Sequence, residues 1–367
     1  MKPFKCYCGN ALFFENSRCL QCGTGTGYDP ACGSMVPLRA GGSLQRCRNG
    51  VEHQVCNWLV PAKGATPWCE ACRLNRTIPD LGQPGNLALW RRMEAAKRRL
   101  LYTLFELGLT VPMLAENDQA GIAFDFLRTV SFPPVTTGYL QGVITVNLEE
   151  ADDALRELRR QELGEPSRTL LGHFRHEIGH YFYEQWLGVL WPDNPRSVAF
   201  RELFGDPTAN YSDALAWHYQ QGPRPGWEGA FISAYASMHP WEDWSETWSH
   251  YLQIFEGLET CASLGLDLSG SALAIPRFPP EAGMLPRVMD NGGRGDAEFL
   301  LWLGRWARLS PVLNEISASL GQSALYPFVL SVPVARKLRF VHHLVRERAT
   351  RRRSAPNWNQ ETFPYHT

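Results

Sequence analysis

The sequence predicts an α+β protein with a small, cysteine-rich N-terminal domain, a mostly helical second domain and a small sheet. Three observations support this fold class. Nine of the ten cysteines lie within the first 72 of 367 residues. Most of the remaining chain places apolar residues at helical spacing. Two segments, 121–127 and 142–148, have the composition of strands and are separated by a loop rich in Pro and Gly.

Composition and charge exclude several classes of protein. Hydrophobic residues make up 44% of the chain and charged residues 20%, which allows a sizeable core and excludes global disorder. The 36 Lys and Arg residues against 37 Asp and Glu residues give a net charge of -1, so nucleic-acid binding is disfavoured. No apolar run reaches the roughly 18–20 residues of a membrane span, and the N-terminus lacks the apolar stretch of a signal peptide. We therefore expect a soluble, cytoplasmic protein without membrane contact.

The clustered cysteines predict two structural zinc sites. A reducing cytoplasm keeps thiols free, so such clusters indicate metal ligands. The alternative is an N-terminal segment that is cross-linked by disulfides. A Cys-x2-Cys knuckle lets two thiolates reach one tetrahedral zinc, and each of the two knuckles needs an upstream pair. His53 or Cys32 can replace a ligand of the second site; otherwise Cys32 and Cys261 are left over. The expected ligand sets are Cys6, Cys8, Cys19 and Cys22, and Cys47, Cys56, Cys69 and Cys72.

The rest of the chain is predicted to be largely helical. A Pro/Gly-rich break at 77–86 is the best domain boundary. Apolar periodicity after this break predicts successive helices. Their expected ranges are 87–109, 150–163, 167–187, 207–220, 240–257, 296–320 and 333–349.

One of these helices carries His176-Glu177-Ile178-Gly179-His180, an HExxH motif. Positions i and i+4 share one helix face, so both imidazoles can bind one metal ion. Glu177 is placed to take a proton from a water molecule that the metal activates. Gly179 costs roughly 1 kcal/mol relative to Ala inside a helix, which suggests close packing near the metal. His173, one turn earlier, is a candidate to support the ligands, although a structural role is the more common one for a single extra histidine.

A catalytic zinc usually has three protein ligands, so a third ligand must come from downstream. Glu242, Glu246 and His250 share one helical face in a Trp-rich segment that also contains Asp243, and polar groups buried there need partners. We favour Glu242 as the ligand, with Glu246 supporting it. The competing pair is Glu202 and Asp206, although Asp206 resembles a helix cap.

Tyr235 precedes Glu242 by seven residues, and its phenol can donate to the oxyanion that develops when water attacks a carbonyl. An interfacial core tyrosine is the alternative. HEIGH, Tyr235 and Glu242-x3-Glu246 resemble the gluzincin metallopeptidases. In their anthrax lethal factor type, a Tyr precedes the ligand Glu by the same seven residues, and Ser245 stands where that pattern has Ala.

Across nearly the whole chain, the sequence is similar to a bacterial family of zinc-binding metallopeptidases with an N-terminal zinc ribbon. This resemblance implies cytoplasmic peptidase activity and a catalytic Tyr235. It is carried by CGNALFFENSRCLQCG, CNWLV, CxxCRLNRTIPDL, HEIGHYF, FGD, SAYASMHPWEDWSETWSHYL and LYPFVLS.

These observations predict a zinc metallopeptidase with one catalytic and two structural Zn2+ ions. His176, His180 and Glu242 bind the catalytic ion, Glu177 is the general base and Tyr235 stabilises the oxyanion. The substrate is a protein or peptide, cleaved at a peptide or isopeptide bond, and the ribbon can bind a protein partner. The alternative is a ribbon module that binds protein or nucleic acid and carries a non-catalytic scaffold, motivated by the mild positive charge of the ribbon and the basic tail.

The expected domain boundaries follow from these assignments. The catalytic domain should be zincin-like, with a small sheet from 121–148, the HExxH helix beneath it and a cleft between that helix and the Glu242 helix. The tail should be basic, then polar, and frayed. The four parts are a double zinc-ribbon domain at 1–80, a zincin-like catalytic domain at 84–258, a helical C-terminal lobe at 259–350 and a tail at 351–367.

Overall fold

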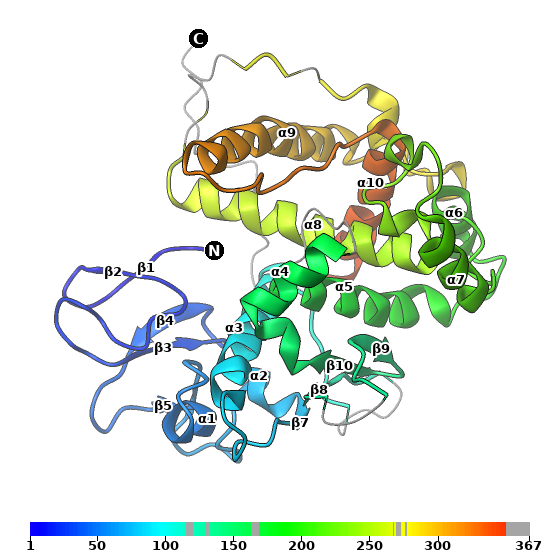
Figure 1. The fold of residues 1–367 in the computed structure, drawn as a ribbon. Coiled ribbons are helices and arrows are strands. Elements are labelled where there is room, and N and C mark those ends of the chain that lie inside the picture. The colour runs from blue at the N-terminus through cyan, green and yellow to red at the C-terminus, as the bar shows by residue number, and fades with distance from the viewer. Residues whose placement is uncertain are drawn as a thin grey trace, which may run out of the picture. The chain divides into compact units, whose positions relative to one another are not determined.

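The computed structural model of the chain is drawn in Figure 1. The chain divides into two compact units. Unit 1 contains Met1–Phe174 and Glu259–Leu266, and unit 2 contains Arg175–Leu258 and Asp267–Ala349. The structure describes residues 1–114, 120–129, 133–162, 169–266, 268, 273–275 and 277–349.

The N-terminal part of unit 1 is built from short antiparallel hairpins, which suits a segment rich in glycine and turn residues. The strands pair as β1 with β2, β3 with β4 and β5 with β6. Two short helices each begin directly after a cysteine. The elements are β1 (Phe4–Lys5), β2 (Ala11–Leu12), β3 (Thr26–Asp29), β4 (Ser34–Pro37), β5 (Leu44–Arg46), α1 (Arg48–Glu52), β6 (Leu59–Pro61) and α2 (Glu70–Arg73).

These hairpins gather eight cysteines into two clusters of four. In the first cluster, the Cys6 and Cys22 Sγ atoms lie 3.6 Å apart, as do those of Cys8 and Cys19. Two thiolates bound about 2.3 Å from one tetrahedral zinc would lie about 3.8 Å apart, so this spacing fits the metal. The two clusters are Cys6, Cys8, Cys19 and Cys22, and Cys47, Cys56, Cys69 and Cys72.

The second cluster resolves an alternative that the sequence left open. All four of its cysteines are buried, and the Cys56 and Cys69 Sγ atoms lie 3.6 Å apart. Cys32 lies outside the cluster, is exposed and places its Sγ 3.7 Å from the carbonyl oxygen of Asp29. The ring of His53 packs 5.6 Å from that of Trp90 instead. Cys261 also lies outside both clusters.

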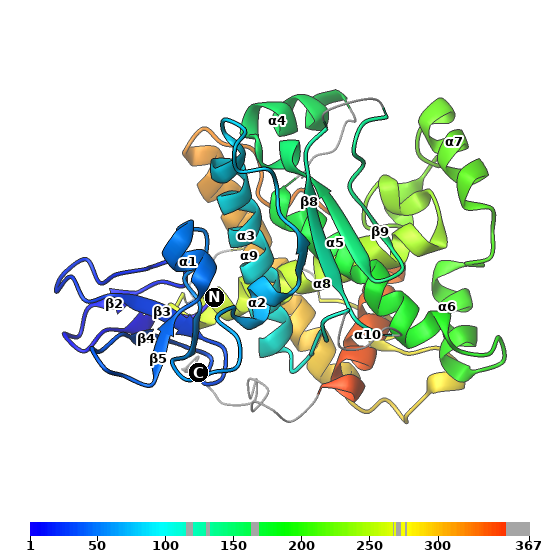
Figure 2. The same ribbon diagram turned by 90° about the horizontal axis from the view of Figure 1, so that it is seen from below.

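A four-stranded sheet follows the second cluster in unit 1. The strand order is β7 (Asn75–Thr77), β8 (Ala123–Leu127), β10 (Val143–Asn147) and β9 (Gly138–Leu140). β7 and β10 both run parallel to β8, whereas β9 runs antiparallel to β10. Two of these strands, β8 and β9, are labelled in Figure 2. Gln141 and Gly142 have φ of 46° and 82°, the left-handed pair that a tight two-residue hairpin turn requires. The sheet confirms the strands expected at 121–127 and 142–148 and adds two short ones.

The long helix α3 (Asn86–Glu106) joins the ribbon core of unit 1. Tyr102 of α3 places its ring 5.2 Å from Phe14 and 5.8 Å from Tyr28, both in the hairpin region. Arg98 donates a hydrogen bond to the carbonyl of Val55, the residue before Cys56. The buried face of α3 is therefore shared with the cysteine-rich segment, so the two do not form separate cores.

Two further helices begin in unit 1. α4 (Asp153–Glu162) starts with an acidic residue and has two basic residues in its last turn, as the helix dipole favours. α5 (Leu170–Tyr183) carries the HExxH motif and continues into a π-helical turn, Glu184–Gly188. Phe174 of α5 packs 5.9 Å from Phe124 and 6.2 Å from Phe126, so the start of α5 lies against β8.

Unit 2 is helical in its described residues. A Trp- and Phe-rich core surrounds α8: Trp248 packs 4.6 Å from Phe182, and Trp244 packs 6.2 Å from Phe340. Asn194, Asn210 and Ser331 cap α6, α7 and α10 with their side-chain oxygens. The helices are α6 (Pro195–Phe204), α7 (Tyr211–Gln221), α8 (Pro240–Ser263), α9 (Asp296–Ser319) and α10 (Val332–Arg348).

The α+β class, with two cysteine clusters and a mostly helical remainder, is confirmed. Each helix expected from periodicity has a counterpart whose ends lie within six residues of the predicted ones, and α1, α2 and α6 are additions. The division at 1–80, 84–258 and 259–350 stays a prediction. The two compact units are drawn differently, and unit 1 takes residues from all three of these parts. The predicted frayed tail at 351–367 lies outside the described residues. Within the described part of the chain, no helix is both long and apolar enough to cross a membrane.

Candidate metal centre

The HExxH motif lies in α5, where its helical periodicity separates two faces. Phe174, Ile178 and Phe182 are buried on the apolar side. His176 and His180 project together from the other side, and their ring centroids lie 4.8 Å apart. This is the arrangement that two histidines four residues apart on a helix should have.

α8 supplies the carboxylate that meets these histidines. The Oε2 atom of Glu242 lies 2.9 Å from Nε2 of His176 and 3.6 Å from Nε2 of His180. The two Nε2 atoms are 3.1 Å apart. The three side chains therefore form a triangle of ligand atoms, all within 4.8 Å of one another.

The dimensions of this triangle fit a zinc ion. Ligand atoms about 2.0–2.1 Å from a tetrahedral zinc would be separated by about 3.3–3.4 Å, and the three observed separations lie on either side of that value. Two imidazole nitrogens and one carboxylate oxygen also form a donor set that zinc uses in catalytic sites. These residues could therefore hold zinc with one position left for another ligand.

A second layer of contacts fixes both imidazole rings. Nδ1 of His176 lies 2.7 Å from Oε1 of Glu246, whose other oxygen accepts a hydrogen bond from Ser233 at 2.6 Å. Nδ1 of His180 lies 2.8 Å from Oγ of Ser245. Each histidine thus has its Nδ1 occupied and its Nε2 turned toward Glu242, which is how metal-binding histidines are usually oriented.

The charges within the site are closely coupled. Burial disfavours a charged imidazole, but Glu242 and Glu246 outweigh it and raise the pKa of His176 well above its usual value. Burial likewise opposes ionisation of Glu242, yet the two histidines hold its pKa well below the usual range. Burial raises the pKa of Glu177, which is only 9% exposed. The buried carboxylates therefore stabilise a positive charge at the histidines. They would stabilise a divalent cation at the same place.

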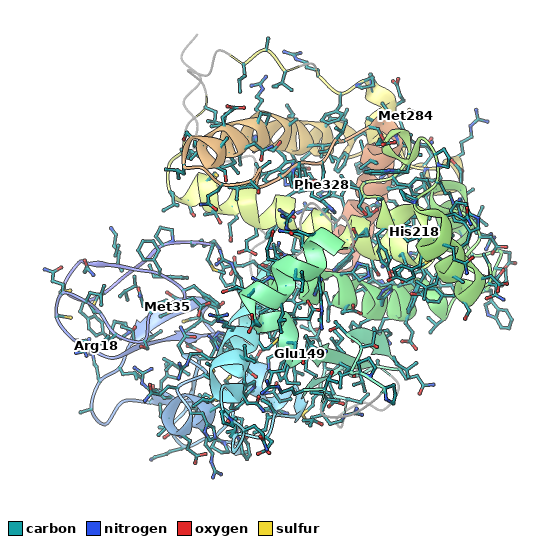
Figure 3. All side chains as sticks on the ribbon, in the orientation of Figure 1. Arg18, Met35, Glu149, His218, Met284 and Phe328 are labelled. Atoms are coloured by element: carbon teal, nitrogen blue, oxygen red, sulfur yellow. The ribbon has the colours of Figure 1, made fainter. Side chains whose placement is uncertain are left out.

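Tyr235 lies beside the histidines, with its ring centroid 6.0 Å from that of His176. Nearby, the Tyr211 hydroxyl donates a hydrogen bond to Oε1 of Glu242 at 2.9 Å. Burial, together with the charge of Glu242, raises the pKa of Tyr235 well above its usual value, so the phenol stays protonated. The ring of His218, labelled in Figure 3, packs 5.8 Å from Tyr235.

The competing acidic residues lie elsewhere. Glu202 is paired with Arg336 at 3.1 Å on the surface. Asp206 accepts a hydrogen bond from the backbone N–H of Thr208 at 2.9 Å in the turn after α6, and the residue that caps the next helix is Asn210, not Asp206 as expected. Asp243 is fully buried and lies 2.6 Å from Nζ of Lys337. Within the described residues, none of these three belongs to the triangle of ligand atoms.

Two histidines near the motif also have other partners. Nδ1 of His173 lies 3.4 Å from Oε2 of Glu150 within unit 1. His250 is buried with Nδ1 3.0 Å from the hydroxyl of Tyr326, and its ring packs 4.4 Å from that of Phe328, which is labelled in Figure 3. His250 thus shares a helix face with Glu242 and Glu246 but belongs to the aromatic core.

Three residues that contact this centre were not predicted as functional: Tyr211, Ser233 and Ser245. Tyr211 begins a helix 31 residues before Glu242, and Ser233 lies in the connection before α8. Neither carries a local signal, since their roles arise from tertiary contacts. Ser245 did carry one, because it lies between Glu242 and Glu246, three residues after the first and next to the second.

Two four-cysteine clusters followed by a helical domain with an HExxH helix define a zinc-ribbon protein with a metallopeptidase-type domain. The chain belongs to the family described as "Putative zinc-binding metallo-peptidase", whose model matches residues 86–344. A zinc-ribbon domain model matches residues 3–83.

The relatives found are mycobacterial. Uncharacterised proteins of Mycobacterium bovis and of two strains of Mycobacterium tuberculosis are each 40% identical over 348 residues. Each match covers 95% of this chain and 96% of the relative. No solved structure matches the chain.

Proposed function

We propose that the protein is a zinc-dependent metallopeptidase that hydrolyses peptide or isopeptide bonds. One observation carries this proposal: His176, His180 and Glu242 place three ligand atoms within 4.8 Å of one another, with Glu177 buried beside them. A purely structural zinc site is usually closed by four protein ligands, whereas three ligands leave a position for a reacting molecule. Membership of the zinc-binding metallopeptidase family supports the same reaction class.

In this proposal, His176, His180 and Glu242 hold one catalytic Zn2+ ion, and the two cysteine clusters hold two structural ones. When bound, the catalytic zinc lowers the pKa of water to about 7 and polarises the substrate carbonyl. Glu246 and Ser245 keep the two imidazole rings oriented through Nδ1. This arrangement is gluzincin-like, with a glutamate from a second helix as third ligand.

The chain's own residues move the protons. Glu177 takes the proton of the attacking water at its carboxylate and passes it to the leaving amine. Burial raises the pKa of Glu177 and therefore favours its holding that proton between the two steps. Tyr235 donates its phenol proton in a hydrogen bond to the oxyanion that forms at the scissile carbonyl.

The remaining assignments concern the setting of the reaction. We propose a bacterial, cytoplasmic protein, because free thiolates for the two ribbon sites persist in a reducing compartment. The substrate is a protein or peptide, and the ribbon provides a surface for a protein partner. Nucleic acid is not expected as a partner, because the net charge is -1.

Metal content tests the proposed site directly. Elemental analysis of the wild type should find three zinc ions, and the double variant His176→Ala/His180→Ala should retain two. Glu202→Gln is the matched control, because Glu202 is a competing carboxylate on the surface, and it should retain three. Two zinc ions in both the wild type and the double variant would contradict the catalytic site and favour a ribbon binding module.

Hydrolysis tests the proposed chemistry. The wild type, loaded with zinc, is incubated with a mixture of unstructured peptides, and new termini are identified by mass spectrometry. Glu177→Gln should keep three zinc ions and lose at least 100-fold in rate, which is the usual contribution of a general base. Equal metal-dependent cleavage by wild type and Glu177→Gln would contradict the role of Glu177.

A further inference from the structure

Glu242 presents only one of its two oxygens to the histidines. Oε2 faces Nε2 of His176 and Nε2 of His180, at 2.9 and 3.6 Å. Oε1 accepts a hydrogen bond from the hydroxyl of Tyr211 at 2.9 Å. A carboxylate can bind zinc through one oxygen or both, and a hydrogen bond to one oxygen favours binding through the other.

The position of Tyr211 is fixed by the start of its own helix. Asn210 caps α7 by accepting a hydrogen bond from the N–H of Asp213. His239, three residues before Glu242, has Nε2 3.0 Å from the carbonyl oxygen of Ala209. The Tyr211 ring also packs 5.4 Å from His239 and 5.7 Å from Trp241. These contacts tie the first turn of α7 to the first turn of α8.

Core packing along the rest of α7 contributes little to the position of Tyr211. None of its residues is fully buried, and its half-buried positions form a single narrow stripe. A helix that contributes so little to the core is positioned chiefly by polar contacts at its ends. The stripe is made of Tyr211, Ala214, Leu215 and His218.

The hydroxyl of Tyr211 donates its proton to Oε1 of Glu242. Tyr211 thus contacts the proposed third ligand, and it makes no hydrogen bond to His176 or His180 within the described residues.

We propose that Tyr211 is a positioning residue of the metal centre, which holds the outer oxygen of Glu242 so that the metal meets Oε2 alone. This inference rests on the metal site proposed above. Binding through one oxygen keeps the protein ligand number at three and the fourth position open. Without the hydroxyl, Glu242 can turn and bind through both oxygens, which fills that position.

The test compares Tyr211→Phe with Tyr219→Phe in the full-length protein. Tyr219 lies on the same helix, is 64% exposed and contacts Glu242 through no hydrogen bond of the described residues, so its loss controls for removal of a phenol from α7. Zinc affinity of the third site is measured by competition with a chelator. The two cysteine-bound zinc ions and the urea unfolding midpoint verify that each variant is folded.

Tyr211→Phe should bind the third zinc 10–100-fold more weakly, the usual effect of removing a group that orients a ligand. Replacing that zinc by Co2+ adds a second measurement. The visible bands of the Co2+ form should weaken in Tyr211→Phe, because a higher coordination number lowers their intensity, and should stay unchanged in Tyr219→Phe.

The outcomes separate the two proposals. Three zinc ions in a folded Tyr211→Phe protein, with wild-type affinity and a wild-type Co2+ spectrum, would overturn the role of Tyr211 and leave the metal site standing. Two zinc ions in the wild type would remove the catalytic site itself, and the role of Tyr211 with it. Equal weakening by both variants would assign the effect to the α7 helix and would also overturn the proposal.

Discussion

Oγ of Ser245 lies 2.8 Å from Nδ1 of His180. When Nε2 of a histidine faces a metal, its Nδ1 carries the proton and donates it. With zinc bound as proposed, the hydroxyl of Ser245, which is fully buried, would be the acceptor for that proton.

Ser245→Ala should therefore weaken zinc binding at the third site about 10-fold, at the lower end of the effects seen for groups that orient metal ligands. Alanine is the better helix former, so a loss of zinc affinity in this variant cannot be attributed to a weakened helix. Chelator competition measures the affinity, with the two cysteine-bound zinc ions as internal reference. An unchanged affinity would mean that His180 is oriented by its other contacts, such as the Trp241 ring 3.8 Å away.

Gly179→Ala should destabilise the fold by about 1–3 kcal/mol, as overpacking of a core does. A Cβ at this position would lie 3.1 Å from Cα of Ser245 and 3.2 Å from Cδ1 of Trp248, where α5 and α8 make close contact. Gly304→Ala is the control, because Gly304 lies in α9 with nothing within 4 Å of its added Cβ. That variant should gain about 0.5–1 kcal/mol from helix propensity alone. Urea unfolding measures the change in unfolding free energy for each variant. If both variants were stabilised, or both destabilised, the close-packing explanation would be contradicted.

Cys56→Ser should lose one zinc ion and lower the urea unfolding midpoint, while Cys32→Ser should keep three zinc ions and the wild-type midpoint. Cys56 belongs to the fully buried cluster, in which metal binding supplies folding free energy. Hydrogen bonds from neighbouring cysteines and, to a smaller extent, the charge of Arg98 hold the pKa of Cys56 well below its usual value. Elemental analysis of both variants checks the outcome. Loss of zinc from Cys32→Ser would reopen the ligand assignment.

The free energy of unfolding should decrease as the pH is lowered from about 6.5, because of His342 in α10. Burial, aided by the charges of Arg339 and Arg346, lowers the pKa of His342 to about 3. The unfolded chain takes up this proton near pH 6.5 and the folded chain does not, so stability is complete above pH 6.5 and is lost as the pH falls toward 3.

His342→Gln removes this dependence and keeps a polar partner for Tyr251, whose hydroxyl lies 3.2 Å from Nδ1 of His342. Between pH 7.5 and pH 5.0, the wild type should lose about 2 kcal/mol more than the variant. Urea unfolding at the two pH values gives the difference between the proteins. If both proteins lose the same free energy, then His342 is protonated in the folded state.

Helix positions could be predicted from the sequence because they depend on local spacing. The apolar periodicity of 240–257 gives a helix regardless of what packs against it, and the structure extends it to Ser263. The strands β7 and β9 were missed because each has only three residues and is defined by its partner: Asn75 pairs with Phe124 of β8, and Tyr139 pairs with Ile144 of β10. Such short segments have no periodicity of their own.

The candidate site divides in the same way. His176 and His180 could be identified from their spacing alone, since four residues is one helical turn. The choice between Glu242 and Glu202 could not be settled by spacing, because both are followed by an acidic residue one turn later. The structure places Glu242 against the histidines and pairs Glu202 with Arg336, which is a matter of which helices meet.

The sequence by itself determined the chemistry available to this protein: eight cysteines in two ribbon sets and two histidines on one helix face. These follow from residue type and local spacing, which the chain carries wherever it folds. Only the tertiary structure decided which atoms the supporting side chains contact: Ser245 lies at His180, the predicted supporting residue Glu246 lies at His176, and Tyr211 lies at Glu242. Those pairs lie 31 to 70 residues apart in the chain. Contacts over that separation depend on helix packing, which no local pattern encodes.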